Sequence, residues 1–378
     1  MKKVCFVFGT RPEAIKMAPV ILHFREMGTF EVKVCVTGQH REMLNQVLDV
    51  FGITPDINLD LMQPDQSLSK LTGRAIEKLD QVFREDKPDL VLVQGDTTTV
   101  FCAALSAFYN NIPIGHIEAG LRTGNLKSPW PEEANRILTT RIADLHFAPT
   151  VAARQNLIKE GICKNQVFET GNTVVDALLR AENILKEKPV KIEDLPDFLQ
   201  PESNSQIKMV LVTSHRRESY GGGFERICKS IRNLAENHSD VHFVFPVHLN
   251  PNVQEPVNRI LGNNANNIHL ITPQPYLHFV GLMLRSYIIL TDSGGIQEEA
   301  PSFGKPVLVM RDTTERPEAI NAGSSILVGT NIDKIVSTAH ELLTNTTAYN
   351  RMANVANPYG DGKASIRVHD ACKSFLGC

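Results

Sequence analysis

Residues 292–299 (DSGGIQEE) combine groups that could hold a phosphate and a sugar. They follow an apolar run, residues 286–291, and Ser293 is of a type favoured at a helix N-cap. Gly294 and Gly295 leave backbone N–H groups unshielded at the helix start, where the helix dipole favours an anion such as a diphosphate. Glu299, about one turn into that helix, could accept hydrogen bonds from both ribose hydroxyls. The alternative interpretation is a tight turn followed by a solvated acidic helix start.

Polar and charged residues also follow the other strand-like runs of the chain. The carboxyl ends of parallel strands are where α/β proteins bind ligands, so this pattern predicts a functional region built from many strand ends. Basic residues gathered near a helix N-terminus would suit a diphosphate. The candidates in the first half are Arg11, Lys16, Asp96, His116, Glu118, Glu132 and Arg136, and those in the second half are His215, Arg216, Arg217, His248, Arg311 and Arg316.

Several of these residues have a simpler structural explanation. Arg11 and Lys16 are compatible with ordinary surface charge on a first helix. Asp96 stands before a run of threonines and is compatible with a helix cap. His215 is compatible with a satisfied structural histidine. These alternatives stay open on the sequence alone.

His116 and Glu118 are i, i+2 on a predicted strand, so we expect them to share one face. A metal pair is one interpretation, but the H-x-E motif of zinc deaminases requires a downstream C-x-x-C, which this sequence lacks. Glu132 and Arg136 are spaced i, i+4 on a predicted helix, as in an ordinary surface ion pair. We predict no metal ion.

Strand-like and helix-like segments alternate along the chain in two series, which predicts parallel sheets covered on both faces. Residues 186–205, rich in Lys, Glu, Asp, Pro and Ser, mark a linker there or slightly before. We therefore predict two Rossmann-like, doubly wound domains, 1–172 with a returning helix in 360–378, and 173–359, with a deep inter-domain cleft for the ligand. The predicted strands are 4–8, 32–36, 89–93, 112–118, 145–148, 167–169, 209–213, 241–245, 268–271, 287–291 and 307–310, and the predicted helices include 67–85, 97–109, 224–236, 332–343 and 364–375.

The composition narrows the class of protein. The 378 residues are 42% hydrophobic and 21% charged, with a net charge of −3, which is typical of a globular protein and argues against nucleic acid as a partner. The apolar runs are too short for a membrane span, and the strand-like start predicts no signal peptide. Seven scattered cysteines without a C-x-x-C predict reduced thiols and a cytoplasmic location.

Familiar cofactor motifs are absent from the sequence. No G-x-G-x-x-G supports a dinucleotide site. Residues 357–364 fail as a Walker loop, because Asn357 replaces the leading glycine and Ala364 replaces the Ser or Thr that binds Mg²⁺. We predict no cofactor.

Six motifs, in order between about residues 4 and 370, make the sequence closely resemble the non-hydrolysing UDP-N-acetylglucosamine 2-epimerases of bacteria and archaea. The motifs are GTRPEAIK at 9–16, GDTTT at 95–99, GHIEAGLRT at 115–123, PEEANR at 131–136, TSHRRE at 213–218 and DTTERPE at 312–318. Each motif alone is weak, but together they are highly specific. The resemblance implies a glycosyltransferase-B-type fold, a homodimer, and interconversion of UDP-GlcNAc and UDP-ManNAc without NAD or metal.

That reaction has a definite chemical requirement. The C2 proton is not acidic, because no carbonyl lies beside it, so a feasible route first breaks the C1–O bond and releases UDP. The oxocarbenium-like C1 then acidifies C2–H, a carboxylate removes the proton, and 2-acetamidoglucal remains beside UDP. Return of a proton to the opposite face and re-addition of UDP give the epimer. The route needs a cationic diphosphate clamp, carboxylates on both sides of the ring and a closed, dry site.

The resemblance assigns roles residue by residue. Asp96, Glu118 and Glu132 are the carboxylates that exchange the C2 proton and steady the cation, with Asp96 and Glu118 favoured for the proton. His215 donates to the departing diphosphate. The remaining positions are Arg11, Lys16, Arg136, Ser293, Gly294 and Gly295 at the phosphates, Glu299 at the ribose, the backbone near Phe279 at uracil, and Arg316 at the sugar.

Some bacterial members of this family bind a second UDP-GlcNAc as an activator. The matching positions here are Gln39, Glu42, Gln66, Glu132, Arg216 and His248, and at Glu42 some regulated members carry Gln. We expect activation to be retained, so that pure UDP-ManNAc reacts only after UDP-GlcNAc is added.

Three other functions fit parts of this pattern. A hydrolysing relative, which releases free ManNAc and UDP, differs in admitting water to the bound intermediate. A retaining glycosyltransferase on the same scaffold needs an acceptor groove, and the carboxylates at several strand ends argue against it. A non-catalytic UDP-sugar sensor could lose Asp96 or Glu118, and both are present. We expect the product to supply ManNAc for a surface polysaccharide.

Overall fold

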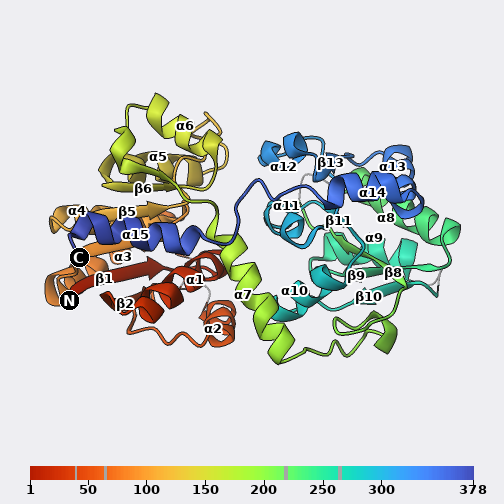
Figure 1. Ribbon diagram of the computed structural model, residues 1–378, viewed down its shortest axis with the longest axis horizontal. Helices are drawn as coiled ribbons and strands as arrows, with labels where there is room; N and C mark the ends of the chain where they lie inside the picture. The colour runs from red at the N-terminus through yellow and green to blue at the C-terminus, as the bar shows by residue number, and fades with distance from the viewer. Residues whose placement is uncertain (39–40, 64–65, 217–219, 263–265) are drawn as a thin grey trace. The chain divides into compact units, whose positions relative to one another are not determined.

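The computed structural model divides the chain into two compact units (Figure 1). It describes residues 1–38, 41–63, 66–216, 220–262 and 266–378, and the side chains of residues 41–43 lie outside this description. Unit 1 comprises Met1–Leu179 and Tyr359–Cys378, and unit 2 comprises Arg180–Pro358. The division falls inside helix α7 (Thr173–Glu187), shortly after the predicted boundary at residue 172.

Unit 1 is built on a seven-stranded sheet in the order β3-β2-β1-β4-β5-β6-β7. Every neighbouring pair is parallel. The strand order reverses between β1 and β4, and such a reversal is where open α/β sheets bind ligands at their carboxyl ends. The strands are β1 (Lys2–Phe8), β2 (Phe30–Val36), β3 (Ile57–Asn58), β4 (Leu90–Gln94), β5 (Ile114–Ile117), β6 (Leu145–Ala148) and β7 (Val167–Glu169).

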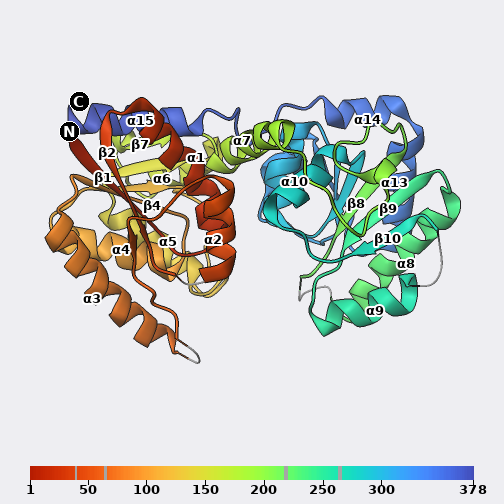
Figure 2. The same ribbon diagram turned by 90° about the horizontal axis from the view of Figure 1, so that it is seen from below.

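Helices cover both faces of this sheet. Figure 2 shows α1 and α15 packed together on one side, with α3 and α4 on the other. The last helix, α15, returns to unit 1 from the end of the chain, and the Asp176 carboxylate accepts hydrogen bonds from the N–H groups of Ala364 and Ser365 at its start. The helices are α1 (Arg11–Met27), α2 (Arg41–Val50), α3 (Leu68–Asp86), α4 (Thr98–Tyr109), α5 (Glu132–Ile142), α6 (Val151–Lys159) and α15 (Ala364–Leu376).

The starts of α1 and α4 follow directly from local sequence. In α1, the Thr10 hydroxyl accepts from the Glu13 N–H while the Glu13 carboxylate accepts from the Thr10 N–H, which is a capping box. In α4, the Thr97 hydroxyl accepts from the Val100 N–H and caps the helix. The alternative interpretation of Asp96 as a helix cap is therefore wrong, because the next residue takes that role.

Unit 2 repeats the architecture with six parallel strands in the order β10-β9-β8-β11-β12-β13. A core that includes Phe224, Phe243 and Phe245 joins α8, α9 and α13 to one face of its sheet. The strands are β8 (Lys208–Thr213), β9 (Val241–Pro246), β10 (Ile268–Ile271), β11 (Ile288–Thr291), β12 (Val307–Val309) and β13 (Ser325–Leu327). The helices are α8 (Gly222–Asn237), α9 (Pro251–Leu261), α10 (Tyr276–Arg285), α11 (Gly294–Glu299), α12 (Pro317–Ala322), α13 (Ile332–Thr344) and α14 (Thr346–Ala353).

The two parallel α/β units confirm the predicted fold class. The predicted strands do not include β3 and β13, which are too short for an apolar run to reveal them. The strand predicted at 112–118 is shorter than expected, and it ends at Ile117 because Glu118 adopts a φ of 65°. Across the described residues, no helix combines the length and apolar character needed to cross a membrane.

Candidate active site

The end of β5 places His116 and Glu118 in different surroundings. Glu118 Oε2 accepts hydrogen bonds from Lys16 Nζ, at 2.6 Å, and from the Gln94 amide. His116 is completely buried, and its Nε2 donates to the Gly95 carbonyl at 2.7 Å. The expectation that the two residues share a strand face is therefore wrong, because strand alternation stops before Glu118. Burial lowers the pKa of His116 to about 4, so a neutral ring holds the Gly95 turn.

Asp96 follows the neighbouring strand, β4, and forms an ion pair with Arg136. A second nitrogen of Arg136 lies 2.9 Å from Glu133 Oε2, and Asn135 donates to the Asp96 backbone carbonyl at 2.9 Å. Arg136 thus pairs with Glu133 across i, i+3. The alternative of an i, i+4 surface pair with Glu132 is wrong, because α5 turns Arg136 toward Asp96. Glu132 is the first residue of α5 and is partly buried.

Unit 1 therefore brings together four of its predicted site residues at adjacent strand ends. β4 and β5 are paired in parallel, and the Gly95 N–H donates to the Ile117 carbonyl at 3.0 Å. Asp96 and Glu118 are the residues that directly follow these two. Each carboxylate contacts a cation that sequence analysis assigned to phosphate. The four residues are Lys16, Asp96, Glu118 and Arg136. A fifth predicted residue, Arg11, begins α1 and is partly buried.

Glu13 is a buried carboxylate of this region to which sequence analysis gave no role. Its Oε2 accepts from the N–H groups of Gly9 and Thr10 at 2.9 and 2.7 Å, and its Oε1 accepts from the Thr97 hydroxyl at 2.6 Å. Burial raises the pKa of Glu13. The side chain ties the turn after β1 to the residue that follows Asp96. The Thr-x-x-Glu spacing of a capping box was the signal available in the sequence.

In unit 2, Asp292 organises the turn that follows β8. Asp292 Oδ2 accepts three hydrogen bonds of 2.8 Å, from the Ser214 hydroxyl and from the N–H groups of His215 and Arg216. The His215 ring stacks on His248, with ring centroids 5.5 Å apart, and 46% of its side-chain surface is exposed. The alternative of a satisfied structural histidine is therefore wrong. Partial burial lowers the pKa of His215, His248 and Arg216 act in the same direction, and Asp292 opposes them.

The Gly-rich stretch forms the short helix α11 directly after β11. Ser293 occupies the N-cap position, but its side chain makes no capping hydrogen bond. Glu298 and Glu299 are buried, with exposed fractions of 3% and 9%, so the alternative of a solvated acidic helix start is wrong. Glu298 Oε1 accepts from Arg316 Nε at 2.8 Å, which fixes that guanidinium beside the helix.

Three arginines converge on the carboxylate of Glu315. The closest nitrogens of Arg311, Arg216 and Arg316 lie 2.6, 3.3 and 3.5 Å from its oxygens. Burial acts to raise the pKa of Glu315, but a backbone hydrogen bond, Arg316 and Arg311 hold the pKa below its usual value. A Cβ at Gly294 would lie 3.4 Å from the Arg316 guanidinium carbon, so glycine lets the start of α11 approach this cationic cluster closely.

The backbone near Phe279 lies in the first turn of α10. The Phe279 N–H already donates to the Pro275 carbonyl at 2.9 Å. The uracil contact near Phe279 stays a prediction.

The positions assigned to an activator are described only in part. Gln39 and the side chain of Glu42 lie outside the described residues. Gln66 is partly buried in unit 1. Arg216 and His248 belong to the strand ends of unit 2, beside the imidazole described above.

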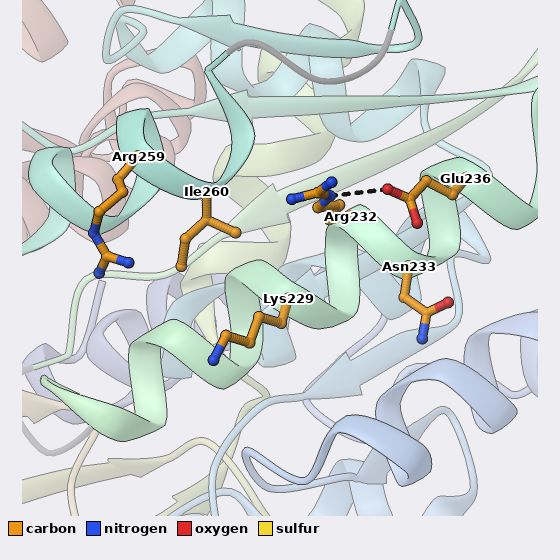
Figure 3. A pocket seen from close by; sticks show the side chains of 6 residues that line it. All are labelled: Lys229, Arg232, Asn233, Glu236, Arg259 and Ile260. Carbon is orange, nitrogen blue, oxygen red and sulfur yellow. Dashed lines mark hydrogen bonds and ion pairs between the residues drawn. The ribbon is translucent and has the colours of Figure 1, made fainter.

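Two surface pockets of unit 2 contain none of the predicted site residues. The larger, of about 490 Å³, lies between α8 and α9 (Figure 3) and is lined by Lys229, Arg232, Asn233, Glu236, Arg259 and Ile260. Its cations are balanced by carboxylates, as in the 2.8 Å pair of Arg232 with Glu236. Exposed ion pairs of this kind contribute little to the stability of the fold. The other, of about 460 Å³, is lined by Arg226, Asp312, Thr330, Asn331, Ile332 and Asp333. In the described part of the chain, no three His, Cys, Asp or Glu side chains are placed to hold a metal ion.

Known proteins share both the sequence and the fold. Residues 23–373 match the family model described as UDP-N-acetylglucosamine 2-epimerase. The chain is 57% identical over 375 residues to the UDP-N-acetylglucosamine 2-epimerase of Yersinia pestis and 55% identical over 375 residues to that of Escherichia coli, with 98% of both chains covered in each comparison.

Two crystal structures extend the comparison. The UDP-GlcNAc 2-epimerase of Neisseria meningitidis bound to UDP-GlcNAc matches with a TM-score of 0.87 and 52% identity, covering 100% of both chains. The enzyme of Methanocaldococcus jannaschii in complex with UDP-GlcNAc and UDP matches with a TM-score of 0.77 and 34% identity, covering 98% of this chain and 99% of the other. The predicted resemblance and the two-domain, glycosyltransferase-B-type fold class are confirmed. The chain therefore belongs to the UDP-N-acetylglucosamine 2-epimerase family and is an epimerase of the isomerase class.

Proposed function

We propose that this protein interconverts UDP-GlcNAc and UDP-ManNAc by reversible, non-hydrolytic epimerisation at C2, without a cofactor. The observation that carries this proposal is the pair of carboxylates at adjacent strand ends, Asp96 bonded to Arg136 and Glu118 bonded to Lys16. The reaction needs proton acceptors and diphosphate-binding cations close together. The Methanocaldococcus jannaschii relative, described in complex with UDP-GlcNAc and UDP, supports a nucleotide sugar as the ligand.

Cleavage of the C1–O bond comes first in the proposed reaction. The bonding electron pair leaves with the β-phosphate oxygen of UDP, and C1 becomes oxocarbenium-like. Asp96 or Glu118 then removes the acidified C2 proton, and the C–H electron pair forms the double bond of 2-acetamidoglucal. The other residue, acting as a carboxylic acid that has taken a proton from solvent, delivers that proton to the opposite face of C2, and the UDP oxygen adds back to C1. Glu132 would steady the positive charge that develops on the ring.

Binding of the diphosphate would exchange the partners of the unit 1 cations. Lys16 contacts Glu118 at 2.6 Å, with 14% and 9% of the two side chains exposed, and Arg136 contacts Asp96. A diphosphate is a multiply charged competitor for Lys and Arg. A carboxylate whose cation has moved to phosphate holds a proton more tightly. Substrate binding would thereby prepare the carboxylates to accept a proton.

Unit 2 would hold the nucleotide and assist the leaving group. His215 would donate to the departing diphosphate, and the short helix after β11 would meet the phosphates. We assign the phosphates to Ser293, Gly294, Gly295 and Arg11, the ribose to Glu299, uracil to the backbone near Phe279, and the sugar to Arg316. We further propose a homodimer in the cytoplasm, a second UDP-GlcNAc as activator, and use of the product as a ManNAc source for a surface polysaccharide.

The test is purified protein with UDP-GlcNAc in D₂O, followed by NMR. We expect deuterium at C2 of both UDP-sugars and no free sugar. Release of free ManNAc with UDP would establish the hydrolysing reaction instead, and absence of any product would refute the proposal. Asp96→Asn should abolish deuterium incorporation while UDP binding persists, and unchanged exchange would remove Asp96 from the mechanism. A parallel sample of pure UDP-ManNAc should react only after UDP-GlcNAc is added, and a prompt reaction would rule out the activator.

A further inference from the structure

Asp292 is a completely buried carboxylate at the end of β11. One of its oxygens, Oδ2, accepts three hydrogen bonds of 2.8 Å, from the Ser214 hydroxyl and the N–H groups of His215 and Arg216. Three donors on one oxygen fix the carboxylate in both position and rotation. The direction in which the other oxygen points is thereby set by the backbone.

That other oxygen, Oδ1, faces the imidazole of His215. Among the described residues Oδ1 has no hydrogen-bond partner, and Nδ1 of His215 lies 3.7 Å away. The distance is too long for a hydrogen bond, but catalytic hydrogen bonds often tighten only when substrate binds. A buried oxygen without a partner costs free energy, so a small rotation of the half-exposed ring toward Asp292 is favourable.

We infer that Asp292 is a positioning residue that accepts a hydrogen bond from Nδ1–H of His215 and so directs Nε2 to the departing UDP. The inference rests on the proposed function, in which His215 serves the leaving group. As the C1–O bond breaks, its electron pair goes to the β-phosphate oxygen, and the Nε2 proton moves to the same oxygen. Re-addition of UDP to C1 returns that proton to Nε2. The Asp292 carboxylate stabilises the imidazolium form of the ring.

The other neighbours of His215 oppose a charged ring. Partial burial lowers the pKa of His215, and the stacked His248 and the adjacent Arg216 lower it further. Of the described groups that act on this ring, Asp292 is the one that raises its pKa. Asp292 therefore limits how far the pKa of His215 falls, which favours the imidazolium form that protonates the leaving group.

Asp292→Asn tests this role in the full-length protein. The three donors around Oδ2 favour the amide oxygen at that position, which leaves the amide NH₂ facing Nδ1 of His215. We expect the pKa of His215 to fall and its neutral ring to switch to the Nε2–H tautomer. Because activity needs the protonated ring, the alkaline limb of kcat should move to lower pH, with a loss of about 10²–10⁴-fold above it. Imidazole ¹⁵N NMR, with His215 assigned by its loss in His215→Asn, and pH–rate profiles measure these changes.

The control is Asp176→Asn, which removes another buried carboxylate that accepts backbone N–H bonds, those of Ala364 and Ser365 in unit 1. It should leave the His215 titration and the alkaline limb unchanged. The tautomer of neutral His215 can be measured in the wild-type protein, so this test does not depend on a variant that folds. The Nδ1–H tautomer supports the inference, and the Nε2–H tautomer overturns it. An Asp292→Asn protein with an unchanged His215 titration also overturns it. Failure of the proposed function is distinct, because the wild-type protein would then make no UDP-ManNAc.

Discussion

The two units hold their strand-end carboxylates in opposite ways. In unit 1, Asp96 and Glu118 are bonded to the cationic side chains of Arg136 and Lys16. In unit 2, Asp292 is bonded to two backbone N–H groups and a hydroxyl. A charged ligand can take over a side-chain cation, but it cannot displace backbone donors that belong to the fold. Carboxylates suited to changing partners are therefore kept in ion pairs, and a carboxylate suited to staying in place is tied to the backbone.

Unit 1 also contains carboxylates that are bonded to backbone N–H groups. Glu133 is fully buried and accepts from the N–H groups of Thr123 and Gly124, each at 3.0 Å, as well as from Arg136. Glu13 does the same for the turn after β1. Because Glu133 is held by backbone donors, its bond to Arg136 limits how far Arg136 moves when its other partner changes.

The largest expected effect separates proton transfer from bond cleavage. We expect Glu118→Gln to lower deuterium incorporation at C2 by about 10²–10⁴-fold, because a neutral amide cannot accept the proton. Reversible C1–O cleavage should persist, since it requires the unit 2 donor rather than this carboxylate. C1–O cleavage can be measured with UDP-GlcNAc that carries ¹⁸O in the oxygen between C1 and the β-phosphorus. Each time the bond breaks and re-forms, the label scrambles into the other β-phosphate oxygens.

The matching variant in unit 2 is His215→Asn, which should lose both scrambling and deuterium incorporation. Glu160→Gln serves as a control, since Glu160 belongs to a 2.7 Å ion pair with Arg122 in unit 1 that the proposed reaction does not use. That control should keep both signals. Deuterium incorporation at the wild-type rate in Glu118→Gln would eliminate Glu118 as a proton acceptor.

A second prediction concerns the acid stability of unit 1. His116 and His146 are register partners on β5 and β6, and both are completely buried. Burial lowers the pKa of each from 6.5 to about 4. As pH falls below 6.5, the unfolded chain takes up protons that the folded one does not, so stability falls until pH reaches about 4. Each ring should account for about 3 kcal/mol over this window.

Urea unfolding of the wild-type protein and of His146→Leu measures this effect. Other carboxylates also titrate in acid, so the informative quantity is the difference between the two proteins as a function of pH. We expect the variant to lose roughly half of the histidine-dependent acid sensitivity. A difference that does not change with pH would show that His146 titrates alike in the folded and unfolded chains.

Much of the fold and part of the site could be predicted from the sequence. The strands at Leu145–Ala148 and Val167–Glu169 have the predicted bounds, because short apolar runs between turn residues define them. The adjacency of Asp96 and Glu118 follows from parallel-sheet geometry, which gathers successive strand ends at one edge. The positive φ of Glu118 was not predictable, because no local residue pattern requires it.

The missed residues are those whose partners are distant in sequence. Asp292 bonds to Ser214 across 78 positions, and Glu13 bonds to Thr97 across 84. Hydrophobic periodicity and residue spacing carry no information about such distant pairs. The sequence also does not distinguish a buried carboxylate from an exposed one. The same limit applies to Arg136. Its i, i+4 spacing indicated an ion pair with Glu132, but in the folded chain it pairs with Asp96.

The smallest expected effect tests whether unit 2 also contains an exchangeable carboxylate. Glu315 lies among Arg216, Arg311 and Arg316, so it occupies a cationic cluster beside the start of α11. If the diphosphate competes with Glu315 for these arginines, Glu315→Gln should tighten UDP binding, because an internal anion has been removed. Partly exposed ion pairs contribute about 0.2–1 kcal/mol, which corresponds to a gain of about 1.5- to 5-fold. Isothermal titration calorimetry with UDP at two salt concentrations measures it.

The sign of that change decides how unit 2 compares with unit 1. Tighter binding that weakens with salt would place Glu315 with Asp96 and Glu118, as an anion that yields its cations to the ligand. Weaker binding would place Glu315 with Asp292, as a fixed carboxylate that holds the arginines in position for phosphate. Glu225→Gln is the control, since it breaks a 2.7 Å pair with Arg259, one of the residues that line the pocket in Figure 3, and should leave UDP affinity unchanged. A similar change in that control would mean that net charge, rather than the arginine cluster, sets the affinity.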